Sequence, residues 1–397
     1  MATFSSMISV FFLVFFVGIA SSNPAGNDVK SKLTESINHF AKDVFEVVSK
    51  EYDGKNIAIS PVSTNILLAL LSLTAKGETQ KELIDGLYQP SSGFKSADYK
   101  STVDELKSKD GPKLALKVYI NSDMDAGTDQ LNPTFKKNAV DFEMEAEFLN
   151  FTKQKESAAE MNAWVESKTN NGIKDLINPA DLHKDSFVVL IDALSFMGDF
   201  EKQFNPDFTW NDHFYPEKSE AILLPTMHEF MQYFPYQNTS KKQVLWLPIK
   251  GGYYLVITIP KEEHFKEDEV TDYSGVNMPP PVMAYVALPK FHIETTYEDK
   301  TILTKLGMGT MFTDKAELGV MAKPESKGGV TKSLKKTVIN VDEKGVSAAI
   351  TTGQVAENKS PTQKSQANVF IANKPFYYNL INEDGKTFLS GKFTGKN

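Results

Sequence analysis

The spacing of apolar residues changes in character along the chain. In the first half, apolar side chains recur every three or four residues over several stretches, which is the period of an amphipathic helix. Residues 66–73 are apolar on all sides, which is typical of a fully buried helix. We predict helices over residues 33–50, from Ser60-Pro61 to residue 73, and over residues 81–87, 133–142, 155–168 and 301–306.

Strand-like patterns dominate the second half. Residues 187–196 form a continuous apolar run, the mark of a strand that is covered on both faces. The other predicted strands cover residues 56–59, 114–120, 146–151, 214–215, 231–236, 244–249, 253–259, 282–288, 337–341, 368–372, 377–381 and 387–392. Helices concentrate early and strands late, without strict alternation or a low-complexity linker, so we predict one α+β domain with large sheets.

One long stretch, residues 342–375, follows neither period. A segment of this length without secondary structure inside a compact domain is usually functional or disordered. Its first half, residues 345–352, is glycine followed by small and β-tolerant residues, so it can become a strand where a sheet offers a gap. Its second half, residues 354–368, is polar and carries Pro361, so we expect it to stay solvated and accessible.

The composition restricts the partners and the means of stabilisation. The chain has 397 residues, 41% of them hydrophobic, which suffices for a large core. Its net charge of -8 makes nucleic acid an unsuitable partner. All 43 basic residues are lysine, so bidentate guanidinium contacts are absent. Cysteine is also absent, so the fold has to rest on burial alone.

The first 22 residues resemble a secretory signal peptide. Residues 7–20 are almost wholly apolar but too short to span a bilayer, and small residues at 20–22 suit cleavage. We therefore predict a secreted, extracellular protein whose single domain covers residues 23–397, with no membrane partner. Asn150 and Asn238 begin Asn-x-Ser/Thr sequences and are the predicted glycosylation sites.

Motifs for catalysis and metal binding are missing. There is no Gly-x-Ser-x-Gly elbow, and His228-Glu229 is not followed by a second histidine at zinc spacing. The six histidines are scattered, and without cysteine there is no thiol nucleophile. We predict that the protein is not an enzyme and needs neither a metal nor a cofactor.

A series of short blocks, in order along residues 33–392, is similar to the serpin family. The most specific is residues 343–349 followed about thirty positions later by residues 373–376, which resembles the hinge, the reactive loop and the strands after it. The others are residues 56–63 with 71–77, 162–173, 189–198 and 288–297. The resemblance implies the serpin fold, with about nine helices, three β-sheets and an exposed reactive-centre loop over about 343–368, in a monomer.

The resemblance also implies a suicide mechanism. A target protease attacks the exposed loop and forms an acyl-enzyme, and the cut loop then inserts as a new strand into the main sheet. The hinge of that movement begins at Glu343 and Gly345, where glycine gives backbone freedom. The rest of the implied hinge is Val346, Ser347, Ala348, Ala349, Ile350, Thr351 and Thr352. Every second residue from Val346 would face the core, where Ile350 is large for its slot.

The usual family spacing, counted from Glu343, implies a scissile bond between Lys359 and Ser360. A lysine there suits the acidic primary pocket of a trypsin-like serine protease. Two alternatives remain at this stage. The target is a papain-like cysteine protease, for which Val355 before Ala356 is the more natural recognition site, or the protein is a non-inhibitory serpin that acts as a carrier, chaperone or substrate. Lys364-Ser365 is a second candidate bond, but it lengthens the inserting segment.

Two residues depart from the family pattern where the sheet is expected to part. That region is implied to include Ser60, Ser63, Asp192 and Lys335, and the family usually has asparagine and histidine in place of the last two. A lone buried charge there would be costly, so we predict that Asp192 and Lys335 form an ion pair or a water-bridged pair. Phe200 stands where tryptophan is common in the family.

Overall fold

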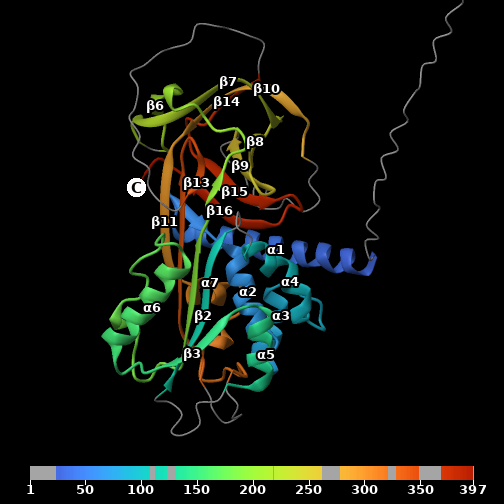
Figure 1. The fold of residues 1–397 in the computed structure, drawn as a ribbon, viewed down its shortest axis with the longest axis vertical. Helices are drawn as coiled ribbons and strands as arrows, with labels where there is room; N and C mark the ends of the chain where they lie inside the picture. Colours follow the sequence, from blue (N-terminus) through green and yellow to red (C-terminus); the bar gives the residue numbers. More distant parts are fainter. Residues whose placement is uncertain are drawn as a thin grey trace, which may run out of the picture.

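The computed structural model describes residues 24–107, 112–122, 131–217, 219–261, 278–320, 328–347 and 368–396. Helices surround one sheet in the lower half of Figure 1, and strands form the upper half. The predicted signal peptide lies outside the described residues. The same holds for the hinge residues Ala348, Ala349, Ile350, Thr351 and Thr352 and for the bond between Lys359 and Ser360.

Seven α-helices lie in the described ranges, fewer than the nine or so that the resemblance implied. Three short segments, residues 179–181, 206–208 and 310–312, make single 3-10 turns, two of them capped by Asn178 and Asn205. The helices are α1 (Pro24–Glu51), α2 (Pro61–Ser72), α3 (Gly77–Gly86), α4 (Ser96–Lys107), α5 (Pro133–Asp141), α6 (Gln154–Lys168) and α7 (Asp299–Lys305).

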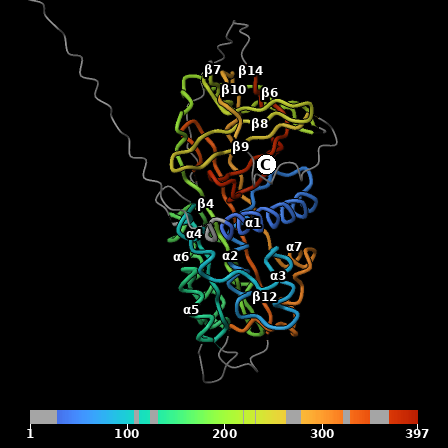
Figure 2. Tube along the Cα trace, turned by 90° about the vertical axis from the view of Figure 1, so that its right-hand side faces the viewer, coloured from blue at the N-terminus to red at the C-terminus, as the bar shows by residue number. Residues whose placement is uncertain are grey.

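Helix α2 is the predicted central helix, and all of its residues are buried. Ser60 is its N-cap position and Pro61 its first residue, where a missing N–H costs nothing. Because the helix is apolar on all sides, it packs against other elements around its whole circumference. In Figure 2 it lies below α1, within the lower half of the molecule.

The main sheet has β12 (Val330–Val341) at its centre, parallel to β4 (Val188–Ser195) and antiparallel to β11 (Phe291–Glu298). On the far side of β4 lie β2 (Lys113–Asn121) and β3 (Glu145–Leu149). Every residue of β4 is buried, as predicted, because one face of the strand packs with α6 and the other on the larger core that contains α2. Two short strands, β5 (Gly198–Asp199) and β13 (Gly345–Ser347), complete the sheet at one end.

The upper strands form one hydrogen-bonded array that changes partners along the 17-residue strand β7 (Ile222–Asn238). One part of β7 pairs with β6 (Thr209–Phe214) and β10 (Pro281–Pro289), which pairs with β14 (Asn368–Ile371). The other part continues through β8 (Lys242–Ile249), β9 (Tyr253–Pro260), β15 (Phe376–Asn382), β16 (Thr387–Phe393) and β1 (Ile57–Ile59). Counted with the main sheet, these make the three expected sheets.

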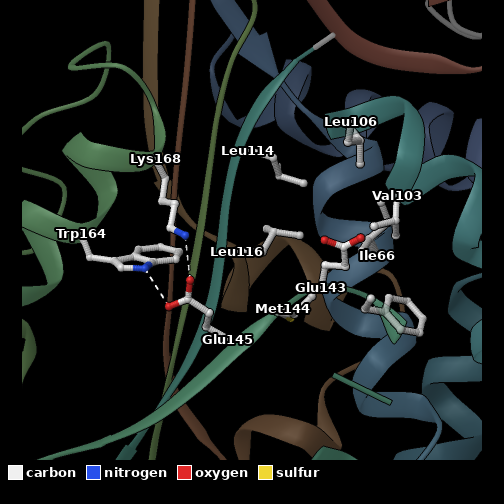
Figure 3. Close-up of a pocket in the computed structure, with 11 residues that line it drawn as sticks. Ile66, Val103, Leu106, Leu114, Leu116, Glu143, Met144, Glu145, Trp164 and Lys168 are labelled. Atoms are coloured by element: carbon white, nitrogen blue, oxygen red, sulfur yellow. Dashed lines mark hydrogen bonds and ion pairs between the residues drawn. The ribbon is translucent and has the colours of Figure 1, made fainter. Parts of the chain in front are cut away.

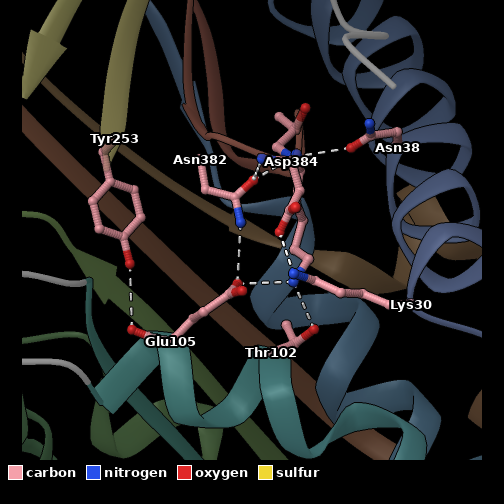
Figure 4. A network of polar contacts seen from close by, with 9 residues as sticks. Lys30, Asn38, Thr102, Glu105, Tyr253, Asn382 and Asp384 are labelled. Atoms are coloured by element: carbon pink, nitrogen blue, oxygen red, sulfur yellow. Dashed lines mark hydrogen bonds and ion pairs between the residues drawn. The ribbon is translucent and has the colours of Figure 1, made fainter. Parts of the chain in front are cut away.

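A buried polar network joins α4 to the hairpin between β15 and β16 (Figure 4). The Lys386 ammonium is 1% exposed and lies 2.8 Å from a Glu105 carboxylate oxygen and 2.9 Å from the Thr102 hydroxyl. Asn382 and the Tyr253 hydroxyl also donate to Glu105. Burial lowers the pKa of Lys386 while Glu105 opposes that shift. In a chain without disulfides, such contacts hold distant segments together.

Candidate functional site: the seam of the main sheet

The seam between β4 and β12 is closed along most of its length and open at one end. β12 pairs with β4 from Val330 to Val338, and then Asn340 and Val341 pair with β13 instead. The other edge of β13 pairs with β5, which follows β4 in the chain. Residues 345–347 of the predicted hinge therefore lie between β12 and β5, at the open end of the seam between β12 and β4.

Gly345 is required at this point for steric reasons. Its φ is +151°, and a Cβ built on it would lie 2.2 Å from the carbonyl oxygen of Gly198. Contacts that short are not found in proteins, so only glycine lets the chain enter between β5 and β12. Val346 follows with 2% exposure and packs in the core, and the Asn340 side chain donates to the Ser347 hydroxyl over 2.9 Å.

Glu343, the first residue of the predicted hinge, anchors the chain at this end of the seam. Its carboxylate lies 2.8 Å from the Lys290 ammonium and accepts a 2.8 Å hydrogen bond from the Thr209 hydroxyl. Burial works against ionisation, but the hydrogen bond from Lys290 and the other donors outweigh it and lower the pKa of Glu343. The Glu343 carbonyl also accepts from the Phe204 amide, and a hollow of about 390 Å³ opens beside Gly345.

The predicted ion pair is present in the middle of the seam. Asp192 on β4 and Lys335 on β12 are register partners, and their charged groups are 3.0 Å apart. Both side chains are almost completely buried, with 1% and 0% exposure. The pair therefore connects the two strands by side chains at a point where their backbones are already hydrogen-bonded.

Helix α2 supplies the polar partners of this pair from below. The Lys335 ammonium donates to the Ser60 carbonyl and to the Thr64 hydroxyl, and that hydroxyl donates to Asp192 over 2.7 Å. Ser63 donates to the Ser60 carbonyl over 2.9 Å, which places both predicted serines in the same cluster. Sequence reasoning missed Thr64, although its position four residues after Ser60 puts it on the same helix face.

A second carboxylate that sequence reasoning also missed lies nearby. Asp299, at the start of α7, is 2% exposed and accepts a 3.0 Å hydrogen bond from Ser333 on β12. Burial raises its pKa to about 7, with Lys335 opposing and Asp192 adding to that shift. Asp192 keeps one oxygen, Oδ1, that has no hydrogen-bond partner among the described residues. The seam thus buries two carboxylates and one ammonium.

Helix α6 lies across the outer face of the same sheet. Its Trp164 indole and Lys168 ammonium contact the Glu145 carboxylate on β3, at 3.0 and 2.7 Å (Figure 3). Beside these contacts is a hollow of about 100 Å³ with mostly apolar walls, among them Leu114 and Leu116 of β2. These contacts hold α6 on the part of the sheet that would have to move if the seam widened.

The two predicted glycosylation sites lie at the surface. Asn238 is exposed at the end of β7, and Asn150 is partly exposed after β3. Among the residues that the structure describes, no group of three histidine, aspartate or glutamate side chains is arranged to hold a metal ion. Within the same residues, no helix combines the length and apolarity needed to cross a membrane.

Removing one partner of the seam ion pair should be far more damaging than replacing both. Asp192→Ala leaves the Lys335 ammonium buried without a counter-charge, so we expect the free energy of unfolding to fall by about 3–5 kcal/mol. The double variant Asp192→Asn, Lys335→His removes both charges and should lose much less. Urea unfolding of the wild type and both variants measures this, and equal losses would refute the pairing.

Asp299 should give the native state a pH-dependent stability. In the unfolded chain an aspartate titrates near 4, whereas burial raises the pKa of Asp299 to about 7 in the fold. Between these values the native state holds a proton that the unfolded state has lost, so this group's contribution to stability falls as the pH rises. Asp299→Asn should therefore gain stability over the wild type at pH 8 and lose that advantage at pH 4. Thermal midpoints across this range check it, and parallel curves would contradict it.

Comparison with known proteins agrees with this geometry. The family model described as serpin (serine protease inhibitor) matches residues 35–395. The chain is 30% identical to an antitrypsin of Bombyx mori, over 96% of this chain and 98% of that protein, and 30% identical to antichymotrypsin-2 of the same species, over 93% and 100%. Among solved structures, Serpin48 of the insect Tenebrio molitor has a TM-score of 0.79 at 28% identity, covering 92% of this chain and 98% of that one. The protein belongs to the serpin family of protease inhibitors.

Proposed function

We propose that this serpin is a secreted inhibitor that traps a trypsin-like serine protease by cleavage at Lys359-Ser360 and insertion of the cut loop into the main sheet. The observation that carries the proposal is the pairing of β13 between β12 and β5. A strand that has already begun to enter the sheet needs only further residues of the same segment to continue. The first residues of that strand to be hydrogen-bonded in the sheet are Gly345, Val346 and Ser347.

The observed register supports insertion at the seam. On one side, β13 pairs with β12 so that Val346 lies opposite Val341. If this antiparallel pairing continued one residue at a time, Thr352 would lie opposite Lys335. On the other side, β13 pairs with β5 so that Val346 lies opposite Gly198. If that pairing continued into β4, Thr352 would lie opposite Asp192. Side chains of register partners point to the same face of a sheet. The Thr352 hydroxyl would then lie between the two charges, where it can donate to Asp192 and accept from Lys335.

The choice of a serine protease rests on Lys359. A lysine before the scissile bond matches an acidic primary pocket of the trypsin type, and the relatives named antitrypsin and antichymotrypsin-2 are consistent with targets of the serine protease class. Secretion is proposed from the apolar segment within residues 1–22, and glycosylation at Asn238 and Asn150 from their position on the surface.

A second function, that of a non-inhibitory serpin, is favoured by one observation. The buried pair of Asp192 and Lys335 has to separate before a strand can enter, and Ile350 has to fit a slot that suits smaller residues. Each of these two requirements would slow the insertion of the cut loop into the main sheet. If insertion is slower than hydrolysis of the acyl-enzyme, the protease is released and the protein is only a substrate.

Lys359 decides whether a protease is trapped. After incubation with trypsin, we expect an SDS-stable complex with the wild type and none with Lys359→Gln, because the acidic pocket loses its cationic partner. Lys364→Gln, in the same segment, is the matched control and should keep the complex. Papain in place of trypsin should yield cleavage without a complex. A cut loop without any complex with trypsin would establish the non-inhibitory function instead.

Thr352 should govern how well the cut loop fits the sheet. Thr352→Val keeps the β-branched shape but removes the hydroxyl, leaving both seam charges without a bridge after insertion. We expect more cleaved and released protein per trapped trypsin, and a smaller gain in melting temperature on cleavage. Thr351→Val, on the opposite face of the inserted strand, is the control. Identical behaviour of the two variants would argue against insertion in the observed register.

A further inference from the structure

The two buried carboxylates of the seam are attached to opposite sides of it. Asp192 lies on β4, whereas Asp299 begins α7 directly after β11 and accepts a 3.0 Å hydrogen bond from the Ser333 hydroxyl of β12. All eight residues of β11 pair with β12. Asp299 is therefore tied to the body formed by β11, β12 and α7, which lies on the far side of the seam from β4.

Lys335 belongs to the same body as Asp299. It is the register partner of Tyr297, two residues before Asp299, and its ammonium lies 5.9 Å from the centre of the Tyr297 ring. Among the neighbouring charges, Lys335 has the largest effect on the pKa of Asp299, which it lowers, while Asp192 raises it. The ammonium is thus within electrostatic reach of both carboxylates, and in the closed sheet its ion pair is with Asp192, at 3.0 Å.

Opening of the seam would leave Lys335 with the other carboxylate. A strand placed between β4 and β12 carries Asp192 away with β4, to about twice the usual strand spacing of about 4.8 Å. The pairing of β11 with β12 is not broken by this movement, so Asp299 keeps its place near the ammonium. A buried ammonium that loses its counter-charge is stabilised by the nearest carboxylate that remains. Asp299 would offset part of the cost of separating Asp192 from Lys335.

The exchange of partners changes the protonation of Asp299. In the closed sheet burial raises the pKa of Asp299 to about 7, and Asp192 adds to that shift. In the open seam Asp192 has moved away and Lys335 has lost its first partner, and both changes lower the pKa of Asp299. The closed sheet then binds more protons than the open one, so a rise in pH favours opening. This effect develops below pH 7 and levels off above it, where both states are ionised.

The other titratable groups on the elements packed against Asp299 leave this role to it. Burial raises the pKa of Tyr297 and that of Tyr52, so both hydroxyls are neutral between pH 5 and 8. Among the charged groups, Lys300 is exposed and the others form ion pairs of their own: Glu298 with Lys332 at 3.1 Å, and Glu51 at the end of α1 with Lys305 at the end of α7.

We propose that Asp299 is a positioning residue that takes over Lys335 when the main sheet opens, so that opening of the seam releases a proton and becomes easier as the pH rises towards neutrality. The use of this exchange in trapping a protease rests on the proposed function. The exchange itself needs neither a protease nor a cut loop.

Hydrogen exchange, followed by mass spectrometry on the uncleaved full-length protein, measures opening of the seam directly. After correction for the intrinsic pH dependence of amide exchange, we expect peptides of β4 and β12 to lose protection about tenfold between pH 5.5 and 8, which corresponds to a fall of about one unit in pKa. Peptides of β8 and β9, outside the main sheet, report global unfolding and should be more protected at every pH.

The variants assign the pH dependence to one carboxylate. Asp299→Asn should abolish the loss of protection in β4 and β12, and Asp299→Leu, which cannot take up the ammonium either, is a second variant with the same expected result. Glu298→Gln changes the adjacent, half-buried carboxylate and is the matched control, which should behave like the wild type. Melting temperatures confirm that each variant is folded.

The outcomes separate this proposal from the trapping function. If active trypsin forms no SDS-stable complex but the seam loses protection with pH in the wild type and not in Asp299→Asn, the exchange stands and trapping fails. If trapping occurs but the wild type and Asp299→Asn have the same pH dependence, the exchange is refuted. If β4 and β12 are as well protected as β8 and β9 at every pH, the seam opens only by global unfolding, and the proposal is equally refuted.

Discussion

The separation of Asp192 and Lys335 is the constraint on which the behaviour of this fold depends. Neighbouring strands lie about 4.8 Å apart, and at that spacing the two charged groups meet at 3.0 Å beneath the sheet. A strand placed between β4 and β12 would double the spacing to about 9.6 Å. The direct contact cannot survive that change, so the closed sheet with its ion pair and the widened sheet are mutually exclusive states.

The two ends of the seam are built differently, and this sets the direction of opening. At the end near β13, the backbone of β12 pairs with the hinge residues of β13 instead of with β4. Only glycine fits at position 345, because a Cβ there would clash with the backbone of β5. Glu343, held by Lys290 and Thr209, fixes the start of the incoming strand. Farther along, the seam is closed by backbone pairing and by the charges. Entry of the proposed inserting strand would thus begin away from the buried pair of Asp192 and Lys335.

Much of this could be predicted from the sequence because the relevant signals are local. The all-apolar residues of α2 and β4 predicted elements buried on every side. The hinge, and the position of Asp192 and Lys335 where the sheet would part, came from the family resemblance, and the cost of burying either charge alone then predicted their pairing. Helix α4 was missed although Tyr99, Val103 and Leu106 have helical spacing and are buried. The roles of Thr64 and Asp299 depend on contacts between distant segments, which no local pattern encodes.

In the proposed mechanism, the ion pair would affect the rate of loop insertion more than the stability of the closed sheet. A buried pair is worth little more than apolar residues of the same volume, but a buried charge that has lost its partner costs several kcal/mol. A half-open seam would contain two such charges and no inserted strand to bridge them. The pair would therefore raise the free-energy barrier to insertion, while the stabilities of the closed sheet and of the fully inserted sheet would hardly change. In the closed sheet, Oδ1 of Asp192 has no hydrogen-bond partner among the described residues. In the proposed trapping function, insertion of the cut loop competes with hydrolysis of the acyl-enzyme, and the buried pair of Asp192 and Lys335 is the contact across the seam that insertion would have to break.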